Sequence, residues 1–161
     1  MSEATTARRN RRRRSRKRRL KEVEKRLPRG YSISGSYVRL NIRFPIDFII
    51  RHVGIWEMNF RGHPVRMDSQ RYRVFKEKGT TCVTCGLKGR HFRLERHALD
   101  KRIARNRFHF NLYAVNGAGQ EVLMTKDHII PKSRGGNNKL ENLQPMCRHC
   151  NEKKGDKQDA L

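Results

Sequence analysis

Acidic residues are scarce in this chain. Its 161 residues contain 15 Asp and Glu against 39 Lys and Arg, which gives a formal net charge of +24 at pH 7. Such an excess attracts polyanions, of which nucleic acid is the commonest and an anionic membrane surface is the other candidate. The charge says nothing about the fold, but it predicts a negatively charged partner.

Long apolar runs are also missing. The most apolar stretch, residues 44–55, is interrupted by a proline and by three charged or polar residues, so it falls short of the ~18 apolar residues that a spanning helix needs. The first residues contain no apolar segment of the signal-peptide type. An Arg-rich start also occurs in organellar transit peptides, but residues 8–19 offer no apolar face. We therefore expect an intracellular protein without a membrane partner, in the cytoplasm of a bacterial host or in a eukaryotic nucleus.

Cysteines are few, and their spacing is informative. In a reducing compartment disulfides are rare, so two C-x-x-C pairs indicate metal ligands, because this spacing lets both thiolates of a pair reach one tetrahedral ion. A redox C-x-x-C is the alternative, but two such pairs without a thioredoxin-like βαβ pattern argue against it. We predict a closed structural Zn²⁺ site that cannot activate water, formed by Cys82, Cys85, Cys147 and Cys150.

The N-terminal 30 residues carry +11 of the net charge, and the block from Arg8 to Arg19 is basic except at Asn10 and Ser15. Like charges at this density repel each other and nothing apolar is available for burial, so we expect disorder in the free chain. A solvated tail and a nuclear localisation signal have the same composition. Because Arg dominates and its guanidinium forks onto phosphate oxygens, we favour a DNA-binding arm that includes Arg8, Arg9, Arg11, Arg12, Arg13 and Arg14.

Residues 31–67 alternate between apolar and polar side chains in two places, 37–44 and 56–60. This alternation predicts half-buried strands and a small β-rich extension with no chemistry of its own. Ser69 is a plausible N-cap for a helix over residues 70–78 that Gly79 ends.

The segment between the cysteine pairs predicts a hairpin. Residues 93–107 are expected to be helical or irregular. The patterns at residues 108–115 and 120–130 predict strands, and residues 116–119 form the turn between them.

A second pattern begins inside this hairpin. Thr-Lys-Asp-His-Ile-Ile-Pro and a Gly-rich loop at 125–136 are followed by Glu-Asn-Leu at 141–143 and by Cys-x-x-Cys-Asn-x-x-Lys at 147–154. In this order the motifs resemble the HNH (His-Me finger, ββα-metal) nucleases, in the branch with a four-cysteine zinc site. The resemblance covers about half of the chain, roughly residues 76–156. It implies an α+β fold with a small ββα-metal domain over residues 68–161, preceded by the β-rich extension and the disordered basic tail.

The residues of the motif suit phosphodiester hydrolysis, which needs a base for water and a cation for the developing charge. The imidazole of His128 is partly neutral near pH 7, and Asp127, its neighbour on a strand, starts on the opposite face. The resemblance implies that His128 is the general base and that Asp127 and Asn151 hold Mg²⁺ or Mn²⁺. It implies that Asn142 supports catalysis by bridging the loop that orients His128. Lys154, one helical turn beyond Asn151, can hold a phosphate oxygen.

The sequence therefore predicts a metal-dependent endonuclease that hydrolyses DNA and leaves 5′-phosphate and 3′-hydroxyl ends. The third motif position, often His in the family, is Asn151 here, a variant compatible with activity. A non-catalytic zinc-knuckle protein that binds DNA or RNA is the alternative, and RNA is a possible partner of the Arg-rich segment. No pattern indicates an oligomeric state.

Overall fold

The structure is a computed structural model that describes residues 3–99 and 107–157. Its centre is a six-stranded sheet in the order β1-β2-β5-β6-β7-β8, in which all neighbouring strands are antiparallel. A separate hairpin pairs β3 with β4. The strands are β1 Tyr31–Ser34, β2 Tyr37–Leu40, β3 Glu57–Phe60, β4 His63–Arg66, β5 Gly89–His97, β6 His109–Val115, β7 Glu121–His128 and β8 Leu143–Cys147.

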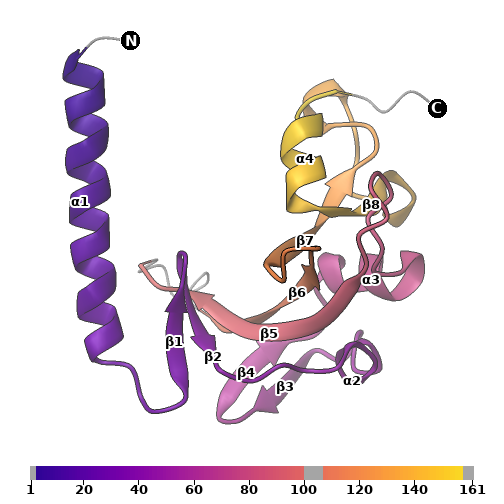
Figure 1. The fold of residues 1–161 in the computed structure, drawn as a ribbon. Helices are drawn as coiled ribbons and strands as arrows, with labels where there is room; N and C mark the ends of the chain where they lie inside the picture. Colours follow the sequence, from indigo (N-terminus) through magenta and orange to yellow (C-terminus); the bar gives the residue numbers. More distant parts are fainter. Residues whose placement is uncertain (1–2, 100–106, 158–161) are drawn as a thin grey trace.

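Four helices accompany the sheet in the described parts of the chain, and their arrangement is shown in Figure 1. Two short 3₁₀ turns, η2 and η3, lie between β7 and β8. None of these helices has the length and apolarity that a membrane-spanning helix needs. The helical elements are α1 Glu3–Lys25, α2 Ile46–Ile50, α3 Gln70–Lys78, α4 Arg148–Lys154, η2 Lys132–Arg134 and η3 Leu140–Asn142.

One face of the sheet is apolar and forms the core. Side chains alternate between the two faces of a strand, so Phe92 and Leu94 of β5 lie beside Phe110 and Leu112 of β6, and all four are fully buried. Residues from α2, α3 and the β3–β4 hairpin join the same apolar cluster. The apolar alternation of β6 thus fixes which face of the sheet these elements cover.

The opposite face carries a buried polar network. Glu95 of β5 is fully buried and accepts hydrogen bonds from Arg39, Asn111 and Tyr113. Glu121, at the start of β7, accepts from Arg39 of β2 at 2.6 Å and from Arg93 of β5. Each buried carboxylate is therefore neutralised by a cation, as burial of charge requires.

Residues 3–25 form the helix α1, whereas the charge density alone predicts disorder in the free chain. Arg, Lys, Leu, Ala and Glu all have high helix propensity, and this local preference is what the charge argument left out. Figure 1 shows α1 standing apart from the sheet, and its contacts include the β1–β2 hairpin, where Arg16 donates to the hydroxyl of Ser36.

Most predicted elements are confirmed, although α1 and the segment from residue 93 differ from the prediction. Ser69 caps α3 by accepting from the amide of Tyr72, and Gly79 ends the helix with φ 81°. The strands at 109–115 and 121–128 and the turn between them are present. The expectation of a helical or irregular segment from residue 93 is wrong for residues 93–97, which belong to β5. Polar side chains of this segment, such as Glu95, take part in the network described above. The segment therefore looks solvent-exposed in the sequence, although its apolar and polar positions alternate as in a strand. Residues 100–106 lie outside the described residues.

The predicted boundary between the β-rich extension and the C-terminal part separates strands that belong to the same main sheet. Strand β2 pairs with β5, with Arg39 opposite Glu95, and helix α3 contacts β7 and β8. The extension thus shares both a sheet and a core with the segment that carries the motif.

Candidate active site and cysteine cluster

His128 is the last residue of β7, at the edge where the strand passes into the loop that contains η2 and η3. Its Nε2 lies 2.9 Å from Oδ1 of Asn138 in that loop. An amide oxygen only accepts hydrogen bonds, so Nε2 carries the proton of the neutral ring. The lone pair is therefore on Nδ1, which is the atom left to take a proton.

Asn142 ties the two ends of this loop together. Its Oδ1 accepts from the backbone N–H of Ile130 at 2.8 Å, and its Nδ2 donates to the carbonyls of Ile130 at 3.1 Å and Asn137 at 2.9 Å. The backbone adds a bond from the N–H of Ile129 to the carbonyl of Asn142 at 3.0 Å. Asn137 precedes the residue that bonds His128, so Asn142 fixes the segment that orients the imidazole.

Gly136 allows this loop to close. A Cβ at this position would lie 1.8 Å from the carbonyl oxygen of Ile130 and 3.0 Å from Nδ2 of Asn142. The second glycine of the Gly-rich loop is therefore required by close backbone approach rather than by an unusual torsion angle.

Asp127 is buried on the face of β7 that meets α4. Its Oδ2 accepts from Nζ of Lys154 at 2.6 Å and from Nε2 of Gln144 at 3.1 Å. The side chains of Asp127 and Lys154 are 9% and 4% exposed. The side chains of Asp127 and His128 contact different elements, as their adjacent positions on a strand require.

Asn151 lies in α4, which begins at Arg148 rather than after Cys150 as the sequence suggested. Its Nδ2 donates to Oγ1 of Thr125 at 2.9 Å, and Thr125 in turn donates to the carbonyl of Met146 at 2.9 Å. This bond turns the amide oxygen of Asn151 away from Thr125. Thr125 and Asp127 share one face of β7, so Asn151 and Asp127 are brought to the same side of the strand.

Lys154 is placed differently from the expectation that it holds a phosphate. Its Nζ donates to Asp127 and to the backbone carbonyls of His128 at 2.7 Å and Ile129 at 3.4 Å. The ammonium is directed into the protein, where it fastens α4 to the end of β7. Helix periodicity placed Lys154 on the correct face, but it did not reveal that this face is covered.

Helix α3 brings two residues to the site that the motif does not contain. Gln70 accepts from Nζ of Lys126 through Oε1, and its Nε2 donates to the carbonyl of Asn138. Partial burial and the nearby charges of Lys132 and Arg71 lower the pKa of Lys126. No sequence pattern pointed to Gln70 or Arg71, because only the fold brings α3 beside β7.

The four cysteines predicted to bind metal lie together. Their sulfur atoms are all within 4.8 Å of one another, and Sγ of Cys85 lies 3.8 Å from Sγ of Cys147. Four thiolates at ~2.3 Å from a tetrahedral zinc ion are separated by about 3.8 Å. The cluster therefore fits a structural zinc ion. It joins the turn before β5 to the start of α4, where Cys147 is the N-cap.

Local geometry supports this cluster. Gly86 has φ 72° and its N–H donates to the carbonyl of Cys82 at 2.9 Å, which closes the first turn. Burial opposes ionisation of Cys82, but hydrogen bonds from backbone N–H groups, those of Cys147 and Cys85 first, lower its pKa to about 7. Burial raises the pKa of Cys147 and of Cys150. Together the four thiolates would require a compensating cation.

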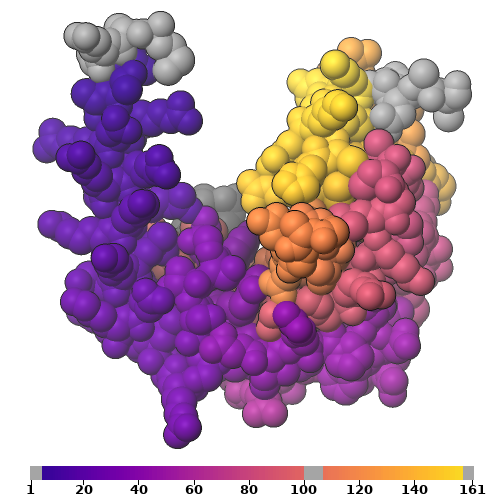
Figure 2. Space-filling view, in the orientation of Figure 1, coloured from indigo at the N-terminus to yellow at the C-terminus, as the bar shows by residue number. Residues whose placement is uncertain are grey.

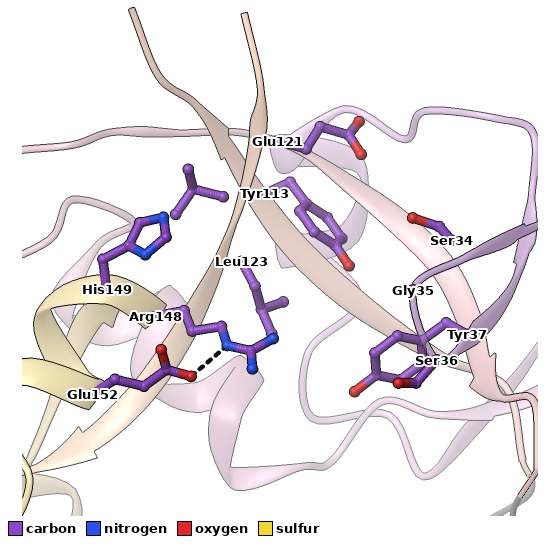
Figure 3. A pocket seen from close by; sticks show the side chains of 11 residues that line it. Ser34, Gly35, Ser36, Tyr37, Tyr113, Glu121, Leu123, Arg148, His149 and Glu152 are labelled. Atoms are coloured by element: carbon purple, nitrogen blue, oxygen red, sulfur yellow. Dashed lines mark hydrogen bonds and ion pairs between the residues drawn. The ribbon is translucent and has the colours of Figure 1, made fainter. Parts of the chain in front are cut away.

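A hollow of about 410 Å³ lies away from the motif residues. Figure 3 shows it between the β1–β2 turn on one side and the first turn of α4 on the other. Arg148 and His149 line it from α4, and Nε of Arg148 donates to Glu152 at 2.6 Å. Neither His128 nor Asp127 contributes to this hollow.

The arginines predicted to bind nucleic acid are exposed on α1, distant in the sequence from the motif. Arg8, Arg11 and Arg12 share one face of the helix and line a hollow of about 630 Å³ that also contains His97. Figure 2 shows α1 and the C-terminal segment projecting from the same side of the molecule, with an open gap between them. The strongest concentration of positive charge thus forms one wall of that gap.

The comparison with protein families gave one match. Residues 117–161 match a family described as HNH endonuclease. The matched segment includes His128, Asn142 and Asn151 but only the second cysteine pair. The comparisons with curated proteins and with solved structures gave no match.

Proposed function

We propose that this chain, whose residues 117–161 match a family described as HNH endonuclease, is a metal-dependent endonuclease that hydrolyses DNA phosphodiester bonds. The observation that carries the proposal is the placement of His128. Its ring is held through Nε2 by Asn138, at the end of a strand whose preceding residue, Asp127, is a buried carboxylate bonded by Lys154 and Gln144. Simple nucleic-acid binding needs neither arrangement.

In this proposal His128 is the general base. With Nε2 protonated and bonded to Asn138, Nδ1 accepts a proton from water as that water attacks phosphorus. A hydrogen bond from Nε2–H to a fixed carbonyl oxygen also stabilises the imidazolium that forms. Asn142 contributes by holding the loop that carries Asn138.

Asp127 and Asn151 are the residues that would hold Mg²⁺ or Mn²⁺. A carboxylate and an amide oxygen are the ligands that hard cations prefer, and both residues face the same side of β7. Because Oδ2 of Asp127 is engaged by Lys154 and Gln144, Oδ1 is the atom offered to a cation. The bound cation would stabilise the charge that develops on the phosphate and on the leaving oxygen. Departure of the 3′-oxygen gives the 5′-phosphate and 3′-hydroxyl ends that the family resemblance implies.

The other predicted parts have supporting roles. Zinc at the four cysteines would stabilise the C-terminal fold without touching the substrate, since all four positions are taken by sulfur. Helix α1 would bind the phosphate backbone of DNA through its arginines and would add affinity without sequence preference. The same helix could accept RNA, which makes RNA a necessary competitor in any binding assay.

The test of this function is plasmid cleavage with Mg²⁺ or Mn²⁺, by the wild-type chain and by His128→Ala, with DNA binding measured in parallel. We expect cleavage by the wild type only, equal binding by both, and no cleavage in EDTA. His52→Ala is a matched control, because His52 follows α2 outside the site, where its ring bonds the backbone carbonyl of Phe48. Cleavage by His128→Ala at the wild-type rate would falsify the assignment of the base. Binding without cleavage by every form would favour the non-catalytic zinc-knuckle protein.

A further inference from the structure

The matched HNH segment does not contain the whole site. Helix α3, about 50 residues before His128 in the chain, contacts β7, β8 and η3. Its first residue, Gln70, bonds Lys126 of the strand that carries the base, and the next residue, Arg71, bonds Asn111 of β6. We propose that Lys126 and Arg71 form a phosphate-binding site beside His128, held in place by Gln70, that grips the DNA backbone at the position of cleavage. This inference rests on the proposed nuclease function.

The position of Lys126 on β7 places it next to the base. Residues two apart on a strand point to the same face and lie about 6.6 Å apart along the strand. Lys126 and His128 therefore share a face, opposite to the face that carries Asp127. A phosphodiester attacked by water at His128 would have a non-bridging oxygen, or the adjacent phosphate, within reach of Nζ of Lys126.

The charge around Lys126 suits an anion. Lys132 and Arg71 are the charged groups that act on it electrostatically, and both are cations. A guanidinium pairs bidentately with phosphate and an ammonium binds it as a compact charge. A phosphate bound at Lys126 would offset the repulsion that these two cations exert on its ammonium.

A chain of hydrogen bonds holds the site rigid. Nζ of Lys126 donates to Gln70, Gln70 donates to the carbonyl of Asn138, and the side chain of Asn138 bonds His128. Arg71 is braced from the other side, where it donates to Oδ1 of the buried Asn111. The helix α3 thus sets the positions of the base and of the proposed phosphate ligands together.

This site takes over the role that the sequence suggested for Lys154. The ammonium of Lys154 is buried against Asp127 and two backbone carbonyls, whereas Lys126 is partly exposed. Lys126 lies on one face of β7, and Lys154 of α4 bonds Asp127 on the other face. One holds the proposed metal ligand and the other would hold the substrate.

The experiment measures binding apart from cleavage. In a His128→Ala background and in EDTA, the affinity for a duplex is measured across salt concentrations for Arg71→Gln, for Lys126→Gln and for the two together. The control pair, Arg51→Gln with Arg61→Gln, removes the same charge from exposed residues at the C-cap of α2 and in the β3–β4 turn. Each phosphate that the variant no longer neutralises should reduce the slope of log affinity against log salt by about 0.9. We expect this reduction in the site variants and a smaller one in the control pair.

A second measurement uses the intact base. Lys126→Gln should lower the cleavage rate at saturating DNA, and Lys126→Arg should restore most of it, since Arg keeps the charge. Equal slopes for site and control variants would overturn the proposal, as would full activity of Lys126→Gln. If the site variants lower the slope but the wild type cuts no DNA, the phosphate site stands and the nuclease function fails. If the wild type cuts DNA and the slopes are equal, the nuclease function stands and the phosphate site fails.

Discussion

The clearest mechanical prediction concerns Asn142, whose side chain makes three hydrogen bonds to the backbone of the loop beside His128. Asn142→Ala removes all three. A typical hydrogen bond contributes about 0.5–1.5 kcal/mol net, so the destabilisation should be about 2–4 kcal/mol, less whatever water recovers at this partly exposed position. That change is large compared with the marginal stability of a domain of this size.

Asn142→Asp changes the hydrogen bonds without changing the side-chain volume, because the two side chains have the same shape. Aspartate still accepts from the N–H of Ile130, but it places a carboxylate oxygen where Nδ2 donated to the carbonyls of Ile130 and Asn137. Two favourable interactions become repulsive. We therefore expect Asn142→Asp to be at least as destabilising as Asn142→Ala, although it is the smaller chemical change.

The assay combines thermal unfolding with plasmid cleavage at a temperature where both variants remain folded. Asn59→Ala is the matched control, since its side chain accepts one hydrogen bond, from Gly62, in the β3–β4 turn. It should cost about 0.5–1.5 kcal/mol and leave cleavage unchanged. If Asn142→Asp is as stable and as active as the wild type, the loop is not held by this side chain and the reasoning fails.

Three further predictions concern other parts of the molecule. Elemental analysis should find one zinc per chain, and Cys82→Ser should abolish zinc binding and unfold the C-terminal part; active protein free of zinc would contradict this. Deleting residues 1–29 should weaken DNA binding and reduce its salt slope by about 0.9 for each phosphate that α1 neutralises, with the cleavage step unchanged, and an unaltered slope would show that α1 is not a DNA arm. Burial opposes ionisation of Glu121, yet hydrogen bonds from Arg93 and His91 lower its pKa to about 2. The stability that this carboxylate provides should be complete above its ordinary pKa of 4.5 and should disappear as pH falls toward 2, so an acid titration of Glu121→Gln should show a smaller fall in stability than that of the wild type.

The sequence predicted the parts of this molecule that depend on local chemistry. The cap at Ser69, the turn at residues 116–119, and the strands on both sides of it follow from side-chain preferences that neighbours do not override. The cysteine cluster was predicted from the spacing of two C-x-x-C pairs in a reducing compartment, for which a shared metal ion was the favoured interpretation.

The parts that depend on tertiary contact escaped prediction. The strand β5 was hidden because Arg93 and Glu95 look like solvent-exposed charges, although each is buried beside a partner on another strand. Lys154 was expected to hold a phosphate oxygen, and its buried contact with Asp127 was not predicted, since helix periodicity does not say which face α4 buries. The contribution of Gln70 could not be predicted from the sequence, because 56 positions separate it from Lys126.

The cysteine cluster has a consequence for how the protein assembles. Cys85 and Cys147 are 62 positions apart, and β5, β6 and β7 lie between the two cysteine pairs in the chain. During synthesis β7 and its histidine leave the ribosome before β8 and the second cysteine pair. The strand that carries His128 therefore has no partner on that side, and no closed zinc cluster, until the chain has been made through Cys150. Assembly in this order delays the completion of the site and gives the nascent chain a period without a formed active site.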